Sequence, residues 1–485
     1  MTIDRWIVDA AAQTPAKPAI EFGEGTLTYS ELAVRVRERA RTLAAAGIGR
    51  GDRVAWYGLN HPEAFVLLFA CASVGALLVP VNWRLSDSEV AEVIAKCRPG
   101  LVVHDRNMRL RARELPDARV VEFDGTYPSG TGGGTGTARR EDPVLLVFTS
   151  GSTGHPKGVV LTQKALACNA AMSVEAHGLT PADRVLNVLP LFHVGGLNIL
   201  PTPAFSVGAT VVLHERFDPG ATCAGLEEVT HAITVPTVLR AVTECSGWKK
   251  VEPGRLRAIS IGSTDVPVPL IETVQERGIP VVQIYGATET GPLAIHQRVG
   301  EAMATTGSIG RAGSHCDVRL VRDGGDVPDG ETGEIWVRGD NVLREYWERP
   351  DLTSEMIRDG WFRTGDVARR DGTGLYWFAD RIKHVVISGG ENIYPAEIER
   401  IVREVPGVAD VAVVGRSDLK WGEVPVAVVV APDGLEAEAV LAPLRGRLAR
   451  YKHPRDVVFV DSLPRNAMGK VVAADVRAML DDVGA

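Results

Sequence analysis

The stretch from Phe148 to Gly158, F-T-S-G-S-T-G-H-P-K-G, gathers the groups that proteins use to hold phosphate. Glycines let the backbone bend sharply and approach a ligand, hydroxyls donate hydrogen bonds, and a lysine supplies a point charge. The candidate binding residues are Thr149, Ser150, Gly151, Ser152, Thr153, Gly154 and Lys157. Apolar runs at 144–148 and 159–161 predict buried strands on either side. The composition therefore fits a phosphate-binding loop, and it also fits an ordinary polar surface turn.

The loop differs from the common nucleotide-binding signatures. In the triphosphate loop G-x-x-x-x-G-K-[ST], Pro156 takes the place of the second glycine, and no G-x-G-x-x-G lies at this junction. A G-x-S-x-G turn occurs nowhere in the chain, which disfavours a serine hydrolase. Phosphate binding here would have to follow another pattern.

Other groups along the chain could also do chemistry. The segment Tyr285-Gly286-Ala287-Thr288-Glu289 follows an apolar strand-like run, Asp366 closes a T-G-D turn, and Lys470 closes P-R-N-A-M-G-K. His193 interrupts the apolar run L-P-L-F-H-V-G-G. Each has an ordinary structural interpretation as well: a turn cap for the aspartate, a solvated charge for the lysine, and a hydrogen-bonded core group for the histidine.

Four segments resemble, in their order along the chain, the signature segments of the AMP-forming adenylating enzymes: T-S-G-S-T-G-H-P-K-G, Y-G-A-T-E, T-G-D and P-R-N-A-M-G-K. This superfamily includes acyl-CoA synthetases, luciferases and peptide-synthetase adenylation domains. The matches span residues 149–470, and the chain looks most similar to CoA ligases of fatty acids or other carboxylic acids. The resemblance implies that ATP activates a carboxylic acid as acyl-AMP with release of pyrophosphate, and that coenzyme A then takes the acyl group. It also implies Mg²⁺ as a cofactor.

The resemblance implies a role for each matching residue. The 149–158 loop would hold the β- and γ-phosphates, and Lys470 would bridge the carboxylate and the α-phosphate. Glu289 would bind Mg²⁺, which accepts one or two carboxylate ligands beside nucleotide phosphates. Asp366 would hold both ribose hydroxyls, as the two acceptor oxygens of a carboxylate allow. The remaining nucleotide contacts would be Gly262, Tyr285, Gly286, Ala287, Thr288 and Arg381.

The acyl pocket is less clearly defined. The segment Phe192-His193-Val194-Gly195-Gly196 matches the family's L-F-H-x-x-G at the mouth of that pocket, so the resemblance makes His193 a pocket residue. Amino-acid-activating relatives usually have an aspartate here to bind an ammonium group, which a histidine cannot replace. The polar run G-S-T-D-V-P at 262–267 replaces a small apolar segment and is a poor wall for a long fatty acid. The acid itself stays open.

The last hundred residues match the family's small C-terminal domain. Lys383 falls on the hinge position, although His384 follows where an acid is usual. Gly389, Gly390 and Trp421 match segments that face the incoming thiol. An open alternative is an acyl-AMP ligase that loads an acyl carrier protein or that activates an unusual small acid for a non-CoA acceptor. A non-catalytic nucleotide-binding module is disfavoured because Lys470 and Glu289 are both present.

Composition is that of a globular enzyme. The 485 residues are 45% hydrophobic and 24% charged, and the net charge of −8 argues against binding to nucleic acid. The six cysteines are scattered without C-x-x-C spacing, so we expect reduced thiols and no cysteine metal site. The start M-T-I-D-R-W-I-V-D lacks the pattern of a secretion signal, and we expect a cytoplasmic enzyme.

The fold class that positions these groups is α/β. Helical patterns alternate with short apolar strands such as 258–262 and 281–285, as in layered sheets. The run Ala64 to Val81 is long enough to suggest a membrane span, but Gly75 divides it into a helix capped by Asn60 and a buried strand. The run V-L-N-V-L-P-L-F-H-V-G-G-L-N reads as a strand that turns at glycines.

We expect two domains. Residues 1–381 would form a large N-terminal AMP-binding domain of layered α/β sheets with a small β-barrel-like part, holding ATP and the acyl group. Residues 382–485 would form a small mobile α+β domain that carries Lys470 and includes a helix at 436–450.

Overall fold

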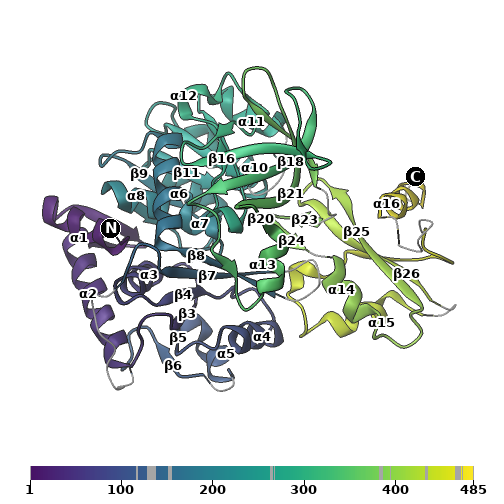
Figure 1. Ribbon diagram of the computed structural model, residues 1–485, viewed down its shortest axis with the longest axis horizontal. Helices are drawn as coiled ribbons and strands as arrows, with labels where there is room; N and C mark the ends of the chain where they lie inside the picture. Colours follow the sequence, from purple (N-terminus) through teal and green to yellow (C-terminus); the bar gives the residue numbers. More distant parts are fainter. Residues whose placement is uncertain are drawn as a thin grey trace. The chain divides into compact units, whose positions relative to one another are not determined.

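The computed structural model describes residues 2–115, 118–127, 138–150, 156–262, 266, 268–381, 386–393, 395–431, 435–464, 471 and 473–483. Contacts divide the chain into two compact units (Figure 1). The N-terminal unit comprises Met1–Trp83, Lys96–Phe148 and Gly158–Asp380. The C-terminal unit comprises Arg84–Ala95, Thr149–Lys157 and Arg381–Ala485. The predicted class is confirmed: the fold is mixed α/β, with a large N-terminal and a smaller C-terminal part.

The largest sheet of the N-terminal unit has a parallel centre with antiparallel edges. Across it lie β15 (Arg311–Ala312), β14 (Ile295–His296), β13 (Val281–Tyr285), β12 (Ala258–Gly262), β11 (His231–Thr234), β9 (Arg184–Asn187), β10 (Thr210–Leu213), β1 (Pro18–Phe22) and β2 (Gly25–Thr28). The strands predicted at 258–262 and 281–285 are confirmed. Their carboxyl ends meet at one edge, where ligands bind in open parallel sheets.

The second sheet carries the strands on either side of the glycine-rich loop. Across it lie β19 (Glu345–Tyr346), β8 (Pro156–Thr162), β7 (Pro143–Ser150), β4 (Leu77–Pro80), β3 (Arg53–Tyr57), β5 (Leu101–His104) and β6 (Val120–Glu122). Apart from residues at their ends, the middle strands are buried, which explains their apolar sequences.

The apolar run from Ala64 to Val81 is divided as the sequence predicts. Helix α3 (Pro62–Val74) ends at Gly75, whose φ of +80° suits glycine, and β4 follows. The predicted cap is wrong, because His61 accepts the hydrogen bond of Glu63 N. Asn60 instead bonds to residues far along the chain. Within the described ranges no helix combines the length and apolarity of a membrane span.

The third sheet of the N-terminal unit is antiparallel. It contains β17 (Gly325–Asp326), β16 (Cys316–Arg322), β18 (Thr332–Gly339), β21 (Trp361–Arg370) and β20 (Ile357–Arg358), and β22 (Tyr376–Arg381) pairs with β21. Its inner face packs through Leu320, Ile335 and Val337 against Tyr285 of β13. This core joins the antiparallel sheet to the largest sheet.

The remaining helices of the N-terminal unit cover these sheets or connect their strands. They include α1 (Asp4–Gln13), α2 (Tyr29–Ala45), α5 (Arg109–Arg113), α6 (Gln163–His177), α7 (Val194–Asn198), α8 (Pro201–Val207), α9 (Pro219–Leu226), α10 (Pro236–Glu244), α11 (Val268–Gln275), α12 (Val299–Ala302) and α13 (Pro350–Met356). One expectation is corrected here: the strand predicted across the 185–198 run ends at Asn187, and its glycines lie in α7.

The C-terminal unit is built on a sheet buried on both faces. It contains β24 (Glu391–Ile393), β23 (Val386–Ser388), β26 (Gly422–Val430), β25 (Asp410–Asp418) and β27 (Asp456–Phe459). Alternate residues of β25 point to opposite faces. Val411 and Val413 pack with α14 (Pro395–Val402), whereas Ala412 and Val414 pack with α16 (Ala473–Val483).

The helix predicted at 436–450 is mostly absent. Helix α15 covers only Ala437–Leu441, and a single 3₁₀ turn follows at Ala442–Leu444. Pro443 cannot donate a backbone hydrogen bond, and Gly446 has a φ of +75°. These two residues stop the helix.

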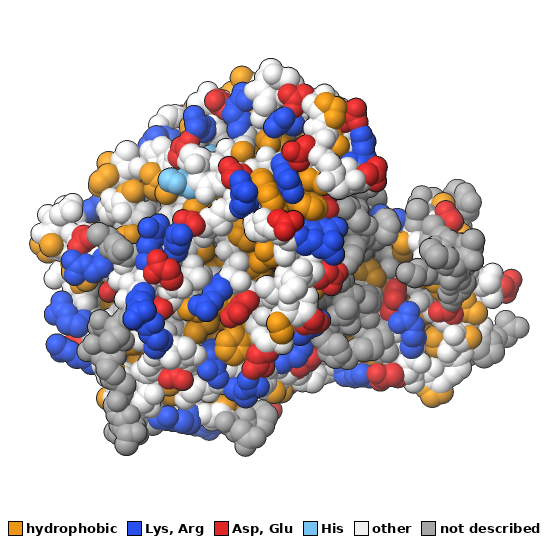
Figure 2. Space-filling model, viewed as in Figure 1, with side chains coloured by type: hydrophobic (Ala, Val, Ile, Leu, Met, Phe, Trp, Pro, Cys, Tyr) orange, Lys and Arg blue, Asp and Glu red, His pale blue; other side chains and the backbone are white. Residues whose placement is uncertain are grey.

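Charges on the visible surface are mixed. On the face shown in Figure 2, lysine and arginine side chains are interspersed with aspartate and glutamate. The described residues on that face therefore form no continuous basic track of the kind that nucleic-acid binding requires.

A buried ion triad ties helix α4 (Asp87–Cys97) into the C-terminal unit. The Lys452 ammonium lies 2.7 Å from Glu89 and 2.9 Å from Glu397. All three side chains are buried, with Lys452 only 2% exposed. Burial by itself lowers the pKa of Lys452, but the two carboxylates outweigh that effect and raise its pKa above the ordinary value of 10.5. The lysine is therefore charged in the folded chain at neutral pH, and its stabilising contribution is lost only as the pH rises through that raised pKa.

A Lys452→Met substitution should destabilise the C-terminal unit by about 3–5 kcal/mol at pH 7, because it leaves two buried carboxylates without their cation. The measurement is the thermal unfolding midpoint. Arg447→Met breaks the exposed pair with Glu404 and should cost below about 1 kcal/mol. Equal small shifts in both variants would show that the triad contributes nothing beyond a surface pair.

Candidate active site

The candidate site centres on the tight turn that follows β13. A Cβ on Gly286 would lie 1.6 Å from the carbonyl oxygen of Pro292, so only glycine fits there. The Thr290 hydroxyl accepts from Ala287 N at 2.9 Å and donates to Pro292 O at 2.9 Å. These contacts fold the 285–292 segment back on itself. Thr288 and Glu289 lie at its tip, on a 3₁₀ turn (Thr288–Thr290).

Three buried asparagines hold this turn from behind. Asn169 of α6 accepts from Leu293 N at 3.0 Å, and Asn198 of α7 donates to Gly291 O at 3.2 Å. Asn341 donates to Thr290 O at 3.1 Å and to Leu293 O at 2.7 Å. All three are 0% exposed. Because each pairs with backbone groups that would otherwise be buried without a partner, the turn is rigidly positioned.

Tyr285 and Asp366 come together from two different sheets. The Tyr285 hydroxyl donates to Asp366 Oδ2 at 2.9 Å, and both residues are nearly buried. Asp366 sits at a register shift in β21, where Gly365 has a φ of +74°. Such a bulge re-aims a side chain. The second carboxylate oxygen of Asp366 keeps the capacity of an acceptor.

Glu289 is held by the segment that contains β19. The Tyr346 hydroxyl donates to Glu289 Oε1 at 2.8 Å, and Leu343 N donates to the Glu289 carbonyl at 2.7 Å. Among the described residues, Oε2 accepts no hydrogen bond. No cluster of three or more His, Cys, Asp or Glu able to hold a metal is found in that part of the chain. A single carboxylate whose Oε2 accepts no hydrogen bond from the described residues fits a hard cation that would take one carboxylate oxygen, with phosphate and water as its other ligands.

The two strands next to the glycine-rich loop are closely packed. A Cβ on Gly158 would lie 2.8 Å from Leu146 and 2.9 Å from Trp347, so β8 can approach both only with glycine there. Thr149 lies near the end of β7, and Lys157 lies on β8. The predicted phosphate-binding residues Gly151, Ser152, Thr153 and Gly154 lie outside the described residues, as do the side chains of Ser150 and Arg381.

His193 belongs to an aromatic cluster at the start of α7. Its ring lies 4.5 Å from that of Phe192, and Trp83 meets Phe192 edge-on at 6.2 Å. Asn60 fixes the preceding segment by donating to Leu189 O and accepting from Leu191 N, both at 2.9 Å. Because Asn198 at the other end of α7 bonds to Gly291, this cluster is tied to the turn that carries Glu289. The predicted pocket and nucleotide segments thus share one framework.

The strand β12 is supported by neutral histidines. Ser260 lies 2.6 Å from His177 Nε2, and His231 Nε2 lies 3.1 Å from the His177 carbonyl. Burial lowers the pKa of His177 to about 3 and that of His231 to about 4. Both rings are uncharged at neutral pH and act as hydrogen-bonding groups. At the end of β12, a Cβ on Gly262 would lie 2.4 Å from Ile284 O, which keeps β12 and β13 close.

In the C-terminal unit, two of the predicted segments meet. Gly389 and Gly390, with φ of +58° and +82°, form the two-residue turn between β23 and β24. Gly389 N donates to Trp421 O at 2.9 Å, and a Cβ on Gly389 would lie 2.8 Å from the Trp421 ring. The predicted residues Lys383 and Lys470 lie outside the described residues.

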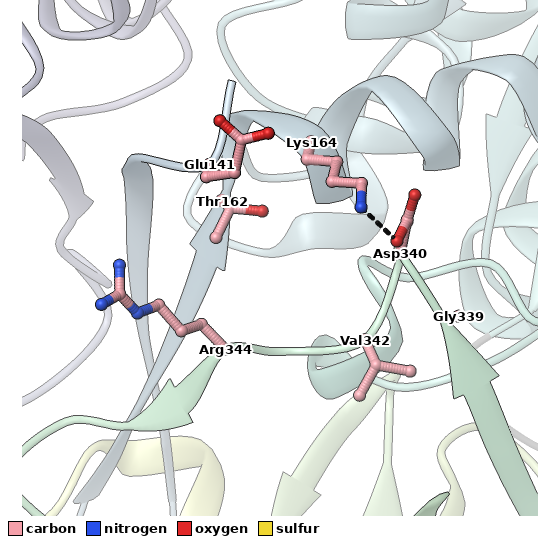
Figure 3. Close-up of a pocket in the computed structure, with 7 residues that line it drawn as sticks. All are labelled: Glu141, Thr162, Lys164, Gly339, Asp340, Val342 and Arg344. Carbon is pink, nitrogen blue, oxygen red and sulfur yellow. Dashed lines mark ion pairs between the residues drawn. The ribbon is translucent and has the colours of Figure 1, made fainter. Parts of the chain in front are cut away.

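A shallow surface pocket of about 430 Å³ lies on the N-terminal unit beside the same framework (Figure 3). Its lining includes Thr162 of β8 and Val342, and Lys164 and Asp340 form an ion pair across it at 2.7 Å. None of the predicted site residues lines it. Its charged groups of both signs define no ligand.

Sequence reasoning missed the residues that hold the motifs in place. The hydrogen bonds that do this join site segments to residues at least 48 positions away along the chain, namely Tyr346, Asn198, Asn341 and Asn60. A polar residue inside an apolar run, such as Asn198 in V-G-G-L-N-I-L, is the only local signal available. It marks a buried hydrogen bond without naming the partner.

Comparison with family models matches residues 7–347 to the AMP-binding enzymes and residues 397–470 to the AMP-binding enzyme C-terminal domain. An indoleacetate–CoA ligase of Aromatoleum aromaticum is 45% identical, covering 99% of this chain and 98% of its own. A feruloyl-CoA synthase of an Amycolatopsis species is 40% identical, with 97% and 98% covered.

A solved structure has the same fold throughout. The o-succinylbenzoate CoA synthetase of Bacillus subtilis, as a double mutant bound to its product analogue, superposes with a TM-score of 0.89. It is 32% identical, and the alignment covers 98% of both chains.

Proposed function

Because the chain belongs to the family of AMP-binding enzymes, we propose that its substrate is an aromatic acid whose carboxylate sits on a short side chain of the ring. The chain is an AMP-forming acyl-CoA synthetase. It activates a carboxylic acid with ATP, releases pyrophosphate, and transfers the acyl group from acyl-AMP to coenzyme A. Its substrates are a small-molecule acid, ATP and coenzyme A.

The similarity to an indoleacetate–CoA ligase over nearly the whole chain carries the proposal of an aromatic acid. The feruloyl-CoA synthase and the o-succinylbenzoate synthetase also have names that describe ring-bearing acids. The cluster of Trp83, Phe192 and His193 supports the same reading, because aromatic rings pack edge-on or offset against one another. The polar run at 262–267 fits a compact substrate better than a long alkyl chain.

In the first half-reaction, a carboxylate oxygen attacks the α-phosphorus of ATP, the bond to the β-phosphate breaks, and pyrophosphate leaves. Lys470 bridges the carboxylate and the α-phosphate, and the residues 149–157 bind the β- and γ-phosphates. Thr288 binds phosphate, and Asp366 with Arg381 holds the ribose. The adenine is bordered by Gly262, Tyr285, Gly286 and Ala287. Mg²⁺ bound by Glu289 and phosphate oxygens would offset negative charge there. Catalysis rests on positioning and fixed donors rather than on a covalent enzyme intermediate.

In the second half-reaction, the thiolate of coenzyme A attacks the acyl carbon, and AMP leaves. Residues 1–381 supply the ATP and acid sites, and residues 382–485 supply Lys470 and, through Gly389, Gly390 and Trp421, the face toward the thiol. Lys383 is the hinge between them. The turn at Gly389 packs on Trp421 in the C-terminal unit, which supports a shared role for these residues.

The acceptor and the compartment complete the proposal. An acyl carrier protein is the alternative acceptor, because its prosthetic group ends in the same thiol-bearing arm as coenzyme A. A cytoplasmic location is supported by six cysteines that are all free thiols.

We expect aromatic acids with a one- or two-carbon spacer to give kcat/KM at least about tenfold above that of matched acids without an aromatic ring. Phenylacetate against cyclohexylacetate, and indoleacetate against decanoate, are informative pairs. Pyrophosphate release is measured with each acid, and the thioester is identified by mass spectrometry.

The controls omit coenzyme A or replace it with a holo carrier protein. Equal or higher kcat/KM for cyclohexylacetate and decanoate would contradict the aromatic assignment. If a thioester formed on the carrier protein and not on coenzyme A, the carrier protein would be the acceptor.

A Lys470→Ala substitution should slow acyl-AMP formation at least about a hundredfold, because one fixed donor to the transition state is worth on the order of 3 kcal/mol. Pyrophosphate release reports this step. With synthetic acyl-AMP and coenzyme A supplied, thioester formation should stay near the wild-type rate.

Lys250→Ala, at an exposed lysine, is the matched control and should change neither step. Normal pyrophosphate release by the Lys470 variant would contradict the assigned role of this lysine.

A further inference from the structure

Tyr346 is a buried residue whose phenol reaches the predicted metal ligand Glu289. Its side chain is 2% exposed, and its hydroxyl donates to Glu289 Oε1 at 2.8 Å. The two residues are 57 positions apart: Tyr346 lies on β19 of the second sheet, and Glu289 lies on the 3₁₀ turn that follows β13. A hydrogen bond to a carboxylate is stronger than one between neutral groups, and here it fixes the oxygen that receives it. Oε2 accepts no hydrogen bond from the described residues and therefore stays available to a ligand.

The short segment around Tyr346 also holds the strand that leaves the glycine-rich loop. Arg344 N donates to Val160 O at 2.9 Å, and Trp347 N donates to Gly158 O at 2.7 Å. Strand β19 thereby pairs with β8, with Tyr346 opposite Val159. Leu343 N in the same segment holds the backbone of Glu289. Five consecutive residues, 343–347, thus connect β8 with Glu289.

We infer that Tyr346 is a positioning residue that orients the Glu289 carboxylate toward the divalent cation of the bound nucleotide. The inference rests on the proposed function, in which Glu289 is the protein ligand of Mg²⁺ and the loop before β8 binds the β- and γ-phosphates. If Glu289 and these phosphates held the cation together, the carboxylate and the phosphate site would need fixed relative positions. The segment 343–347 bonds to the backbone of Glu289 and to β8, the strand that follows the loop, and so fixes these two elements relative to each other.

A purely structural role would have different consequences. Tyr29 offers the comparison, because its buried hydroxyl donates to Ala209 O at 2.6 Å, away from the site. Removing either hydroxyl leaves a buried acceptor with one bond fewer and lowers stability. Only the loss of the Tyr346 hydroxyl should change how strongly Mg²⁺ promotes nucleotide binding.

The experiment measures ATP binding by isothermal titration calorimetry on the full chain, once with saturating Mg²⁺ and once with EDTA. The dissociation constant in EDTA divided by the dissociation constant in Mg²⁺ gives the factor by which Mg²⁺ strengthens ATP binding. We expect Tyr346→Phe to reduce this ratio about tenfold, as the loss of a hydrogen bond to a metal-binding carboxylate typically does. Glu289→Gln should reduce it at least as much. Tyr29→Phe should leave it unchanged while lowering the unfolding midpoint.

The double variant Tyr346→Phe with Glu289→Gln tests whether the two residues act together. If Tyr346 acts through Glu289, the double variant should match Glu289→Gln alone, because coupled residues are not additive. The inference would be overturned by any of three results: additive reductions of the ratio in the double variant, an unchanged ratio in Tyr346→Phe, or an equal reduction of the ratio in Tyr29→Phe. Each of these results would leave the proposed function intact. An unchanged ratio in Glu289→Gln would overturn the metal assignment of Glu289 itself, and the inference with it.

Discussion

The contact between Gly286 and Pro292 is the constraint on which the candidate site depends. No side chain fits between these residues, so the chain after β13 folds back immediately and presents its polar groups at one place. Tyr285 reaches Asp366 of the antiparallel sheet, and Glu289 reaches Tyr346 of the second sheet. One short turn therefore joins all three sheets of the N-terminal unit.

This arrangement suits a reaction in which the enzyme forms no covalent bond with its substrate. The charge that develops on phosphate oxygens is stabilised by donors and cations already in place, and misplacing them by an ångström is costly. The buried asparagines behind the turn therefore serve catalysis indirectly: they fix the backbone that carries the functional side chains. Neutral histidines beneath β12 give rigidity there without adding charge.

Sequence patterns predicted those features that local chemistry determines. The strands at 258–262 and 281–285, the division of the 64–81 run at glycine and the family motifs were all readable, because each depends on neighbouring residues. The capping role of Asn60 was predicted wrongly because its partners, such as Leu191, lie more than 100 residues away. Tyr346 was missed for the same reason. The helix predicted at 436–450 ends at Leu441 because Pro443 interrupts it, although the residues around it have a helical pattern.

The central claim is that the carboxylate of the substrate attacks the α-phosphorus of ATP. The most direct measurement uses phenylacetate labelled with ¹⁸O in its carboxylate, followed by mass spectrometry of every product. The account predicts one ¹⁸O atom in AMP, the other in the thioester carbonyl, and none in pyrophosphate. Label in pyrophosphate or inorganic phosphate, with AMP unlabelled, would contradict it.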